Sequence, residues 1–307
     1  MSIPRIVFAG TPEFALASLT ALVASGSLPV AVYTQPDRPA GRGRRTTASP
    51  VKRYAKANDI AVLQPETLRD ESAAAELKAL QPDVLIVAAY GLILPQNVLD
   101  IPAHGCLNVH ASVLPRWRGA APIQAAILAN DPTAGVSLMR MTAGLDCGPV
   151  YSARTVTIGS DENAGELHDR LADLGGELLV ADLEKILDSK IAPVEQDEAL
   201  ATYAAKIQKQ DAELDWTLPA DELRRHIRAY NPEPGAFFFA GDPVRVKVWQ
   251  AQVVRDVDAR PGTFVQYDSD SIVVACGRDG LRLQSLQLPG KRRAPSHEFV
   301  TQIDLRG

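Results

Sequence analysis

The sequence has few cysteines and no long apolar run, and each absence excludes a class of protein. Only Cys106, Cys147 and Cys276 occur, with no close pair, so neither a disulfide framework nor a cysteine zinc site is expected. No apolar stretch approaches the ~18 residues of a membrane span, and the amino terminus lacks a signal-peptide pattern. The protein is therefore expected to be cytoplasmic, free of metal and without a membrane partner.

Glycine fingerprints for phosphate binding are also missing. Neither GxGxxG nor GxxxxGK[ST] follows an apolar run, so the sequence lacks the glycine-rich loops that usually bind the phosphates of dinucleotides and nucleoside triphosphates. The net charge of -5 argues against a protein that binds nucleic acid with its whole surface. Residues 38–45 (RPAGRGRR) are an exception, because they carry four arginines and no acid. This glycine-containing segment is either a solvated loop or a loop that contacts phosphates.

The first part of the chain alternates short apolar runs with helical patterns, which predicts a βαβ arrangement around a largely parallel sheet. Thr11 is expected to cap the first helix, with Pro12 at its first position. Strands are expected at residues 5–9, 30–33, 84–88, 106–110, 136–141 and 150–156, and helices at 12–24, 50–58, 71–80, 120–128 and 162–188.

The second part of the chain has a different pattern. After an irregular segment come a short helix near 220–228 and evenly spaced short strands separated by Gly and Pro turns, which predict a small β-barrel. These strands are expected at 236–239, 244–250, 262–265, 272–275 and 281–286. The predicted domains are 1–189, a linker at 190–206, and 207–307.

The segment GCLNVHASVLP contains the clearest candidates for chemistry. Period-two alternation in a strand at 106–110 places Asn108 and His110 on one face, near the carboxyl end where open α/β sheets bind ligands. Asp146 lies in a glycine-bounded loop after the next strand and is expected at a carboxyl end of the same sheet. An isolated Asn-x-His usually satisfies local backbone groups, and an isolated Asp in such a loop is usually a turn former.

Together these three residues supply a proton acceptor, an oxyanion donor and a carboxylate that orients an imidazole, which acyl transfer to an amine requires. A serine triad is disfavoured because no GxSxG elbow is present. A zinc site is disfavoured because His104 and His110 lack a credible set of further ligands. The predicted catalytic residues are therefore Asn108, His110 and Asp146.

Several strings resemble the folate-dependent formyltransferase family, and within it the methionyl-tRNA formyltransferases. They include LNVHAS, HASVLPRWRGAAPIQ, MTAGLDCGPVY, AGTPEFA, TQPDRPAGRGRR and YAAKIQKQDAELDW, and the resemblance covers nearly the whole chain. It implies a Rossmann-like first domain, an OB-like carboxyl-terminal barrel, and 10-formyltetrahydrofolate as the formyl donor. It also implies transfer to the amino group of methionine on initiator methionyl-tRNA, for translation initiation. The protein is expected to be a monomer.

The resemblance further implies which residues bind each substrate. Ser112, Val113, Leu114 and Pro115 match the family's folate-contact segment, usually SLLP, in which Val113 replaces a leucine. The predicted tRNA contacts are Arg38, Arg42, Arg44, Arg45, Lys206 and Lys209.

Two other functions remain open on the sequence. The Asn-x-His and distant Asp specify the chemistry but not the acceptor, so a small amine such as glycinamide ribonucleotide or a nucleotide-linked amino sugar is an alternative. A non-catalytic RNA-binding protein is the alternative of another class, in which aromatics of the barrel stack on bases. Of Phe237, Phe238, Phe239 and Trp249, at least two are expected in the core.

Overall fold

The computed structural model describes residues 4–40, 45–240, 244–267 and 271–300. The chain divides into two compact units. The first consists of Met1–Pro122, Ala134–Val156 and His168–Ala204, and the second of Ile123–Thr133, Thr157–Leu167 and Ala205–Gly307. The segment expected to be a linker, residues 190–206, therefore belongs to the first unit as far as Ala204.

A seven-stranded sheet forms the centre of the first unit, in the order β10-β9-β7-β6-β1-β2-β5. Five of these strands run parallel, and β9 pairs antiparallel with β7. The strands are β1 (Ile6–Gly10), β2 (Ala31–Tyr33), β5 (Ala61–Leu63), β6 (Val84–Ala88), β7 (Cys106–His110), β9 (Thr133–Arg140) and β10 (Val150–Thr157). Every residue of β1, β6 and β7 is buried, as expected for central strands covered on both faces.

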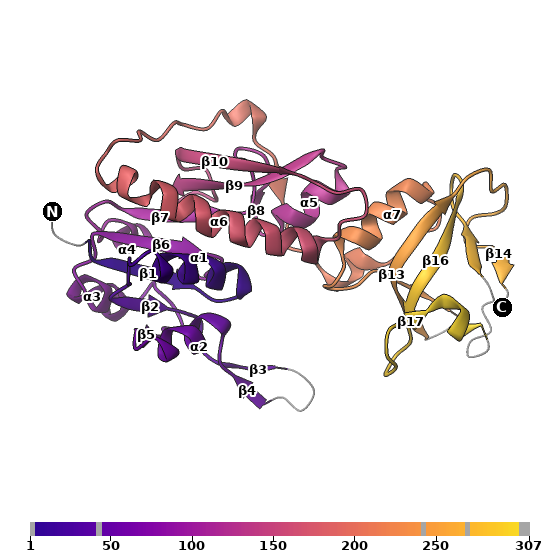
Figure 1. Cartoon of the computed structure of the whole chain (residues 1–307), viewed down its shortest axis with the longest axis horizontal. Coiled ribbons are helices and arrows are strands. Elements are labelled where there is room, and N and C mark those ends of the chain that lie inside the picture. Colours follow the sequence, from indigo (N-terminus) through magenta and orange to yellow (C-terminus); the bar gives the residue numbers. More distant parts are fainter. Residues whose placement is uncertain (1–3, 41–44, 241–243, 268–270, 301–307) are drawn as a thin grey trace. The chain divides into compact units, whose positions relative to one another are not determined.

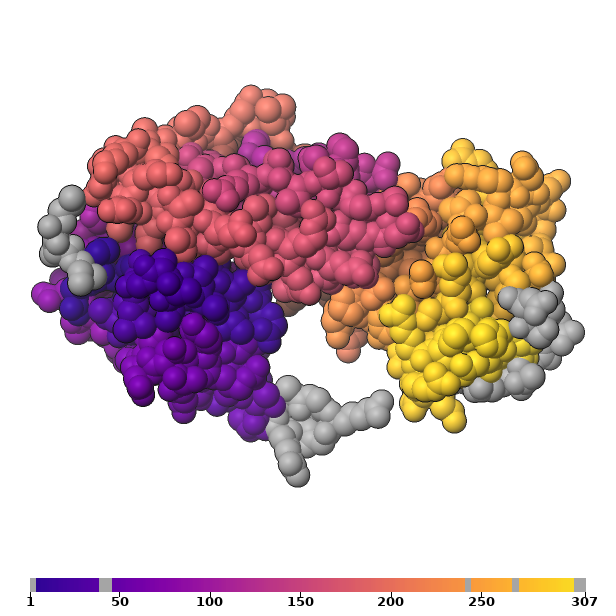
Figure 2. Space-filling model, viewed as in Figure 1, coloured from indigo at the N-terminus to yellow at the C-terminus, as the bar shows by residue number. Residues whose placement is uncertain are grey.

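Helices cover both faces of this sheet. The helix α6 runs along the near side in Figure 1, and its Gly176 lies against Ala21 of α1. Figure 2 shows the outer surface that α1 and α6 form on this side. Leu77 and Val98 pack on the opposite face. The helices in this part of the sequence are α1 (Glu13–Ala24), α2 (Pro50–Ala57), α3 (Glu71–Ala79), α4 (Gln96–Leu99), α5 (Pro122–Leu128) and α6 (Ala164–Leu187), of which α5 belongs to the second unit from Ile123 onward.

Three small elements complete the first unit. A hairpin joins β3 (Arg38–Ala40) to β4 (Arg45–Thr47), and β8 (Arg118–Gly119) pairs in parallel with β11 (Tyr203–Ala204). A single 3-10 turn, η1 (Glu198–Leu200), precedes β11. The sequence analysis did not predict the hairpin, because its glycine-rich arginine segment reads as a loop.

The second unit contains a six-stranded antiparallel sheet and the helix α7 (Ala220–Ala229), and it also includes α5 from Ile123 onward. A register shift beside Gln250 interrupts the long strand β13, and such irregularities let a strand bend. The strands are β12 (Phe237–Phe239), β13 (Arg245–Val254), β14 (Phe264–Tyr267), β15 (Ile272–Ala275), β16 (Gly280–Gln287) and β17 (Ala294–Pro295), with 3-10 turns η2 (Lys209–Ala212) and η3 (Ser296–Phe299).

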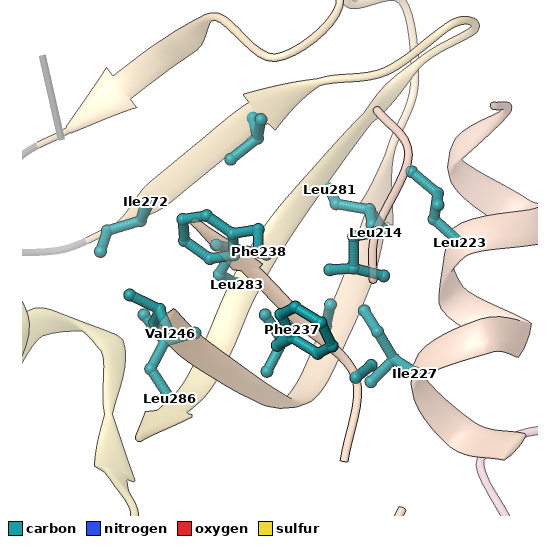
Figure 3. Packing of buried hydrophobic residues seen from close by; sticks show 14 of the residues in the cluster. Leu214, Leu223, Ile227, Phe237, Phe238, Val246, Ile272, Leu281, Leu283 and Leu286 are labelled. Atoms are coloured by element: carbon teal, nitrogen blue, oxygen red, sulfur yellow. The ribbon is translucent and has the colours of Figure 1, made fainter. Parts of the chain in front are cut away.

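The core of the second unit lies between this sheet and α7. Figure 3 shows Phe237 and Phe238 surrounded by apolar side chains of the strands, with Leu223 and Ile227 contributed by the helix. The expectation that at least two of the aromatics are core residues is confirmed, since Phe237 and Phe238 are 5% and 3% exposed. Phe239 is 51% exposed and faces solvent.

The expected fold class is confirmed: a mostly parallel α/β unit is followed by an antiparallel, OB-like one. The expected cap of the first helix is wrong. Thr11 makes no cap, because its hydroxyl instead donates to the Tyr90 carbonyl at 3.1 Å, and the helix begins after Pro12. Within the described ranges, no helix combines the length and apolar character that crossing a membrane requires.

Candidate active site

Two polar side chains point from one face of a strand that is otherwise apolar. Asn108 and His110 alternate on β7 with Leu107 and Val109, which are 2% and 1% exposed. Asn108 and His110 are themselves 8% and 7% exposed. Side chains of this kind are rarely buried unless they have polar partners. Asn108 and His110 are therefore expected to have polar partners near them.

The third candidate, Asp146, reaches this strand by a route that the sequence did not predict. Because β9 is antiparallel to β7, with Arg140 opposite Leu107, the loop at residues 142–149 leaves the sheet where β7 begins. The loop therefore departs from the edge opposite the one at which β7 ends. The loop instead folds back, and it carries the Asp146 carboxylate to Asn108 and His110.

The three predicted catalytic residues come together in the structure. Asp146 Oδ2 lies 3.7 Å from His110 Nδ1, which is within ion-pair reach but too long for a hydrogen bond. Asn108 Nδ2 lies 3.5 Å from Asp146 Oδ1, at the limit of hydrogen bonding. Catalytic hydrogen bonds are often loose before substrate binds and tighten in the complex.

The His110 ring lies between two acceptors. Its Nε2 is 3.0 Å from the carbonyl oxygen of Trp117, which can only accept, so Nε2 carries the hydrogen of that contact. A second proton on Nδ1 would face the Asp146 carboxylate. One ring nitrogen thus faces a backbone carbonyl and the other a carboxylate.

A backbone donor fixes the carboxylate in place. The N–H of Gly119 donates to Asp146 Oδ2 at 2.9 Å. Gly119 has a φ of +112°, and a Cβ there would lie 2.6 Å from the Ala204 carbonyl oxygen. This close approach requires glycine. The sequence analysis missed this contact, since a backbone donor has no side-chain signal.

The segment expected to contact folate follows β7 directly. Ser112 and Leu114 are buried, whereas Val113 and Pro115 are partly exposed. Ser137 on β9 fixes the backbone of this segment, because its hydroxyl accepts from the Leu114 N–H and donates to the Ser112 carbonyl, at 3.1 and 2.8 Å. The turn therefore presents a rigid, partly apolar edge beside His110.

The hairpin of β3 and β4 is braced at its base. Lys52 Nζ binds Asp37 Oδ2 at 2.5 Å and Gln64 Oε1 at 2.6 Å. The hydrogen bond from Lys52 and a second from Gln64 hold the pKa of Asp37 below its usual range. Arg38 is exposed at the start of the hairpin.

The other predicted tRNA contacts have different positions. Arg42 and Arg44 lie outside the described residues, and Arg45 is placed only as the first residue of β4. Lys206 and Lys209 are exposed and belong to the second unit. In the part of the chain that the structure describes, no cluster of three His, Cys, Asp or Glu side chains could hold a metal ion.

Comparison with known proteins identifies the family. A model of the family described as formyl transferase matches residues 4–183, and one described as formyl transferase, C-terminal domain, matches residues 206–303. The chain belongs to the formyl transferase family. The three polar residues of its first unit are thus the candidate active site of a formyl transferase.

Curated relatives match this formyl transferase over nearly its whole length. A methionyl-tRNA formyltransferase from Coxiella burnetii (strain RSA 331 / Henzerling II) is 50% identical over 96% of this chain and 94% of the relative. One from Pseudomonas syringae pv. syringae is 53% identical over 93% of this chain and 90% of the relative.

Solved structures of low sequence identity share the fold. An N-formyltransferase from Helicobacter canadensis, in complex with folinic acid and dTDP-3-aminofucose, is 17% identical, with a TM-score of 0.65 over 92% of this chain and 99% of that chain. HypX from Aquifex aeolicus, in complex with tetrahydrofolic acid, is 18% identical, with a TM-score of 0.66 over 98% of this chain and 47% of that chain.

Proposed function

We propose that this protein transfers the formyl group of 10-formyltetrahydrofolate to the amino group of methionine on initiator methionyl-tRNA. The observation that carries the chemistry is the convergence of Asn108 and His110, from the strand β7, with Asp146, from the loop between β9 and β10. The choice of acceptor is supported by relatives that are named methionyl-tRNA formyltransferase and are about half identical over nearly the whole chain.

The reaction needs no covalent bond to the enzyme. The neutral amine of methionine attacks the formyl carbon, a C–N bond forms, and the carbonyl oxygen becomes an oxyanion. The bond to the folate nitrogen then breaks, and that nitrogen leaves with a proton while the amine loses one. Asn108 Nδ2 donates to the oxyanion, which is worth ~3 kcal/mol per donor in comparable sites. His110 carries the proton from the amine nitrogen of methionine to the folate nitrogen. Asp146 stabilises the charged imidazolium form of His110.

The folate would lie against the turn at residues 112–115. Val113 and Pro115 offer apolar surface, and the fixed backbone between Ser112 and Leu114 keeps this surface rigid. Binding sites of this kind combine apolar walls with a few placed polar groups, which Asn108 and His110 supply here. The apolar turn and these two polar side chains together therefore fit a formyl-folate.

The arginine hairpin would contact the acceptor end of the tRNA. The described part of the hairpin projects from the first unit on a base held by Lys52, Asp37 and Gln64, which gives it a defined direction. Guanidinium groups bind phosphates and stack on exposed bases. Arg42 is the residue of this segment that we propose to matter most.

The second unit would position the tRNA body. Lys206 and Lys209 are exposed, and on β13 and its neighbours cationic side chains lie against aromatic rings. Lys247 Nζ and Arg293 Cζ lie 5.2 and 5.7 Å from the Trp249 ring centroid. Basic side chains interleaved with aromatic rings are typical of nucleic-acid surfaces.

The proposal is tested by offering the pure protein formyl-folate with one acceptor at a time. Charged initiator tRNA is expected to be formylated, whereas glycinamide ribonucleotide and a nucleotide-linked amino sugar are not. Formylation of a small amine but not of the charged tRNA would favour the small-molecule enzyme. Tight tRNA binding without formylation of any acceptor would favour the non-catalytic alternative.

The role of the hairpin has its own test. Arg42→Ala should lower kcat/KM for charged initiator tRNA and alter discrimination against elongator tRNA, while folate affinity changes little. Arg69→Ala, an exposed arginine of the same unit, is the matched control. Equal loss of folate affinity in Arg42→Ala, or unchanged use of tRNA, would contradict the role of this residue.

A further inference from the structure

The backbone of the candidate catalytic aspartate is in an unfavourable conformation. Asp146 has a φ of +48°, in the left-handed region that non-glycine residues rarely adopt. Such a residue keeps its conformation only where its surroundings hold it there. The groups that hold the loop at residues 142–149 therefore also fix the position of the carboxylate.

One side chain supplies this restraint from the segment after α6. Gln196 Nε2 donates to the carbonyl oxygens of Asp146 and Gly148, at 2.8 and 2.7 Å. Its Oε1 accepts from Arg118 Nε at 3.0 Å. The amide of Gln196 thus uses both of its N–H groups on the aspartate loop and its oxygen on an arginine. If the amide were flipped, Oε1 would face two carbonyl oxygens and Nε2 would face the Arg118 guanidinium. Only the observed orientation therefore satisfies all three partners.

Arg118 is itself held from the same segment. Its side chain is only 1% exposed, and its two terminal nitrogens bind the Glu198 carboxylate at 2.9 and 2.7 Å. The hydrogen bonds with Glu198 raise the pKa of Arg118 and lower that of Glu198. A buried guanidinium without this partner would be strongly destabilising, so the pair keeps residues 196–198 in place.

The backbone ties the two segments together a second time. Arg118 N donates to the Thr202 carbonyl at 2.9 Å, and Ala120 N donates to the Ala204 carbonyl at 2.9 Å. Between these two bonds lies Gly119, whose N–H donates to Asp146 Oδ2. The backbone of Asp146 is therefore held by Gln196, and its carboxylate by Gly119, and both groups depend on Arg118 and the strand β11 that pairs with it.

We propose that Gln196 is a positioning residue for formyl transfer, and that residues 196–204 act as a brace that sets Asp146 against His110. This inference rests on the proposed role of Asp146 in formyl transfer. Gln196 touches neither substrate in this mechanism. It acts through the aspartate loop, so its loss should slow the chemical step and leave substrate binding unchanged.

Gln196→Glu is the sharpest test, because it keeps size and shape and still accepts from Arg118. A carboxylate cannot donate to the two carbonyl groups, so the aspartate loop should shift. We expect kcat to fall about 10- to 100-fold, the cost typical of a small displacement in an active site. The KM for charged tRNA and the affinity for formyl-folate should stay within about twofold. Glu195→Gln, an exposed neighbour, is the matched control.

A double variant separates positioning from general damage. In an Asp146→Asn background, Gln196→Glu should cause little further loss of kcat, because residues that act as one unit are not additive. A full additional loss in the double variant, a wild-type kcat in the single variant, or a parallel loss of folate affinity would overturn the proposal.

Hydrogen exchange gives a readout that does not depend on activity. Gln196→Glu should accelerate exchange of the amides in residues 142–149 and of Gly119, while the buried strand β6 stays protected. Unchanged exchange in the aspartate loop would overturn the brace. If the wild-type protein formylated no acceptor, the proposed function would fail, whereas the exchange result would still decide whether the brace exists.

Discussion

Nδ1 of His110 lies 3.7 Å from Oδ2 of Asp146, although the two residues come from a buried strand and from the loop that follows β9. Less than 1 Å of movement would convert this ion-pair distance into a hydrogen bond of ordinary length, about 2.8 Å. The site can therefore tighten on substrate binding while the loop that carries Asp146 keeps its hydrogen bonds to Gln196.

Removal of either polar side chain of β7 should abolish most of the activity. His110→Ala and Asn108→Ala are each expected to reduce formyl transfer by at least ~100-fold, because they remove a proton carrier and an oxyanion donor. Steady-state kinetics and circular dichroism on the same preparations would check this. His104→Ala removes an exposed histidine nearby in the sequence and should be near wild type. Near-native turnover in a well-folded His110 or Asn108 variant would refute the assignment of that residue.

The aspartate loop should tolerate no side chain at Gly148. A Cβ there would lie 1.9 Å from the Arg140 carbonyl oxygen, so Gly148→Ala must displace the loop, at a cost of about 1–3 kcal/mol. We expect a large loss of kcat. Gly26→Ala is the control, since Gly26 has a φ of +84° but nothing within 4 Å of the added atom. Urea unfolding and kinetics should show that Gly26→Ala costs about 1 kcal/mol and no activity.

Cys147 should be the thiol that reacts first with iodoacetamide. Burial raises the pKa of Cys106 and of Cys276 to about 12, whereas Cys147 is partly exposed. The thiolate is the reactive form, so the two buried residues should stay unlabelled in the native protein. Because Cys147 adjoins Asp146, labelling should inactivate the enzyme, and Cys147→Ser should be active and resistant. Mass spectrometry that finds early label on Cys106 or Cys276 would contradict this expectation.

The second unit should lose stability in mild acid. Burial lowers the pKa of His226 below its ordinary value of about 6.5, against smaller opposing effects of Asp211 and Glu222. Below that pH the unfolded chain binds a proton that the folded chain does not, so stability is full above pH ~6.5 and falls as the pH is lowered towards the folded pKa. Urea unfolding monitored by tryptophan fluorescence between about pH 7.5 and 5.5 should show the decline, and His226→Phe should flatten it. An equally steep decline in His226→Phe would contradict this cause.

Strand positions were predictable where burial decides them. Val84–Ala88, Cys106–His110 and Ile272–Ala275 form strands at the expected residues, because each is a short apolar run that the core must cover on one or both faces. The shared face of two candidate catalytic residues was predictable for a related reason. Alternation on β7 requires Asn108 and His110 to share a face, whatever the rest of the fold does.

Strand direction and backbone contacts could not be predicted from local patterns. The antiparallel pairing of β9 with β7 depends on tertiary packing, and it reverses the edge from which the Asp146 loop departs. Gly119 acts through its N–H, and Gln196 lies in a segment with no periodic pattern, so neither position carries a signal in its own residue type. Thr11 has the residue type of a cap, but the Tyr90 carbonyl competes successfully for its hydroxyl.

The pairing of β8 with β11 has a consequence for protein engineering. The chain passes to the second unit directly after Ala204, which is hydrogen-bonded beside Gly119. A chimera that exchanges carboxyl-terminal domains between homologues should therefore be joined after Ala204, although the irregular stretch before it looks like the convenient junction. A join at residue 190 would take residues 196 and 198 from the other homologue, and would so separate the aspartate loop and Arg118 from the native Gln196 and Glu198 that bind them.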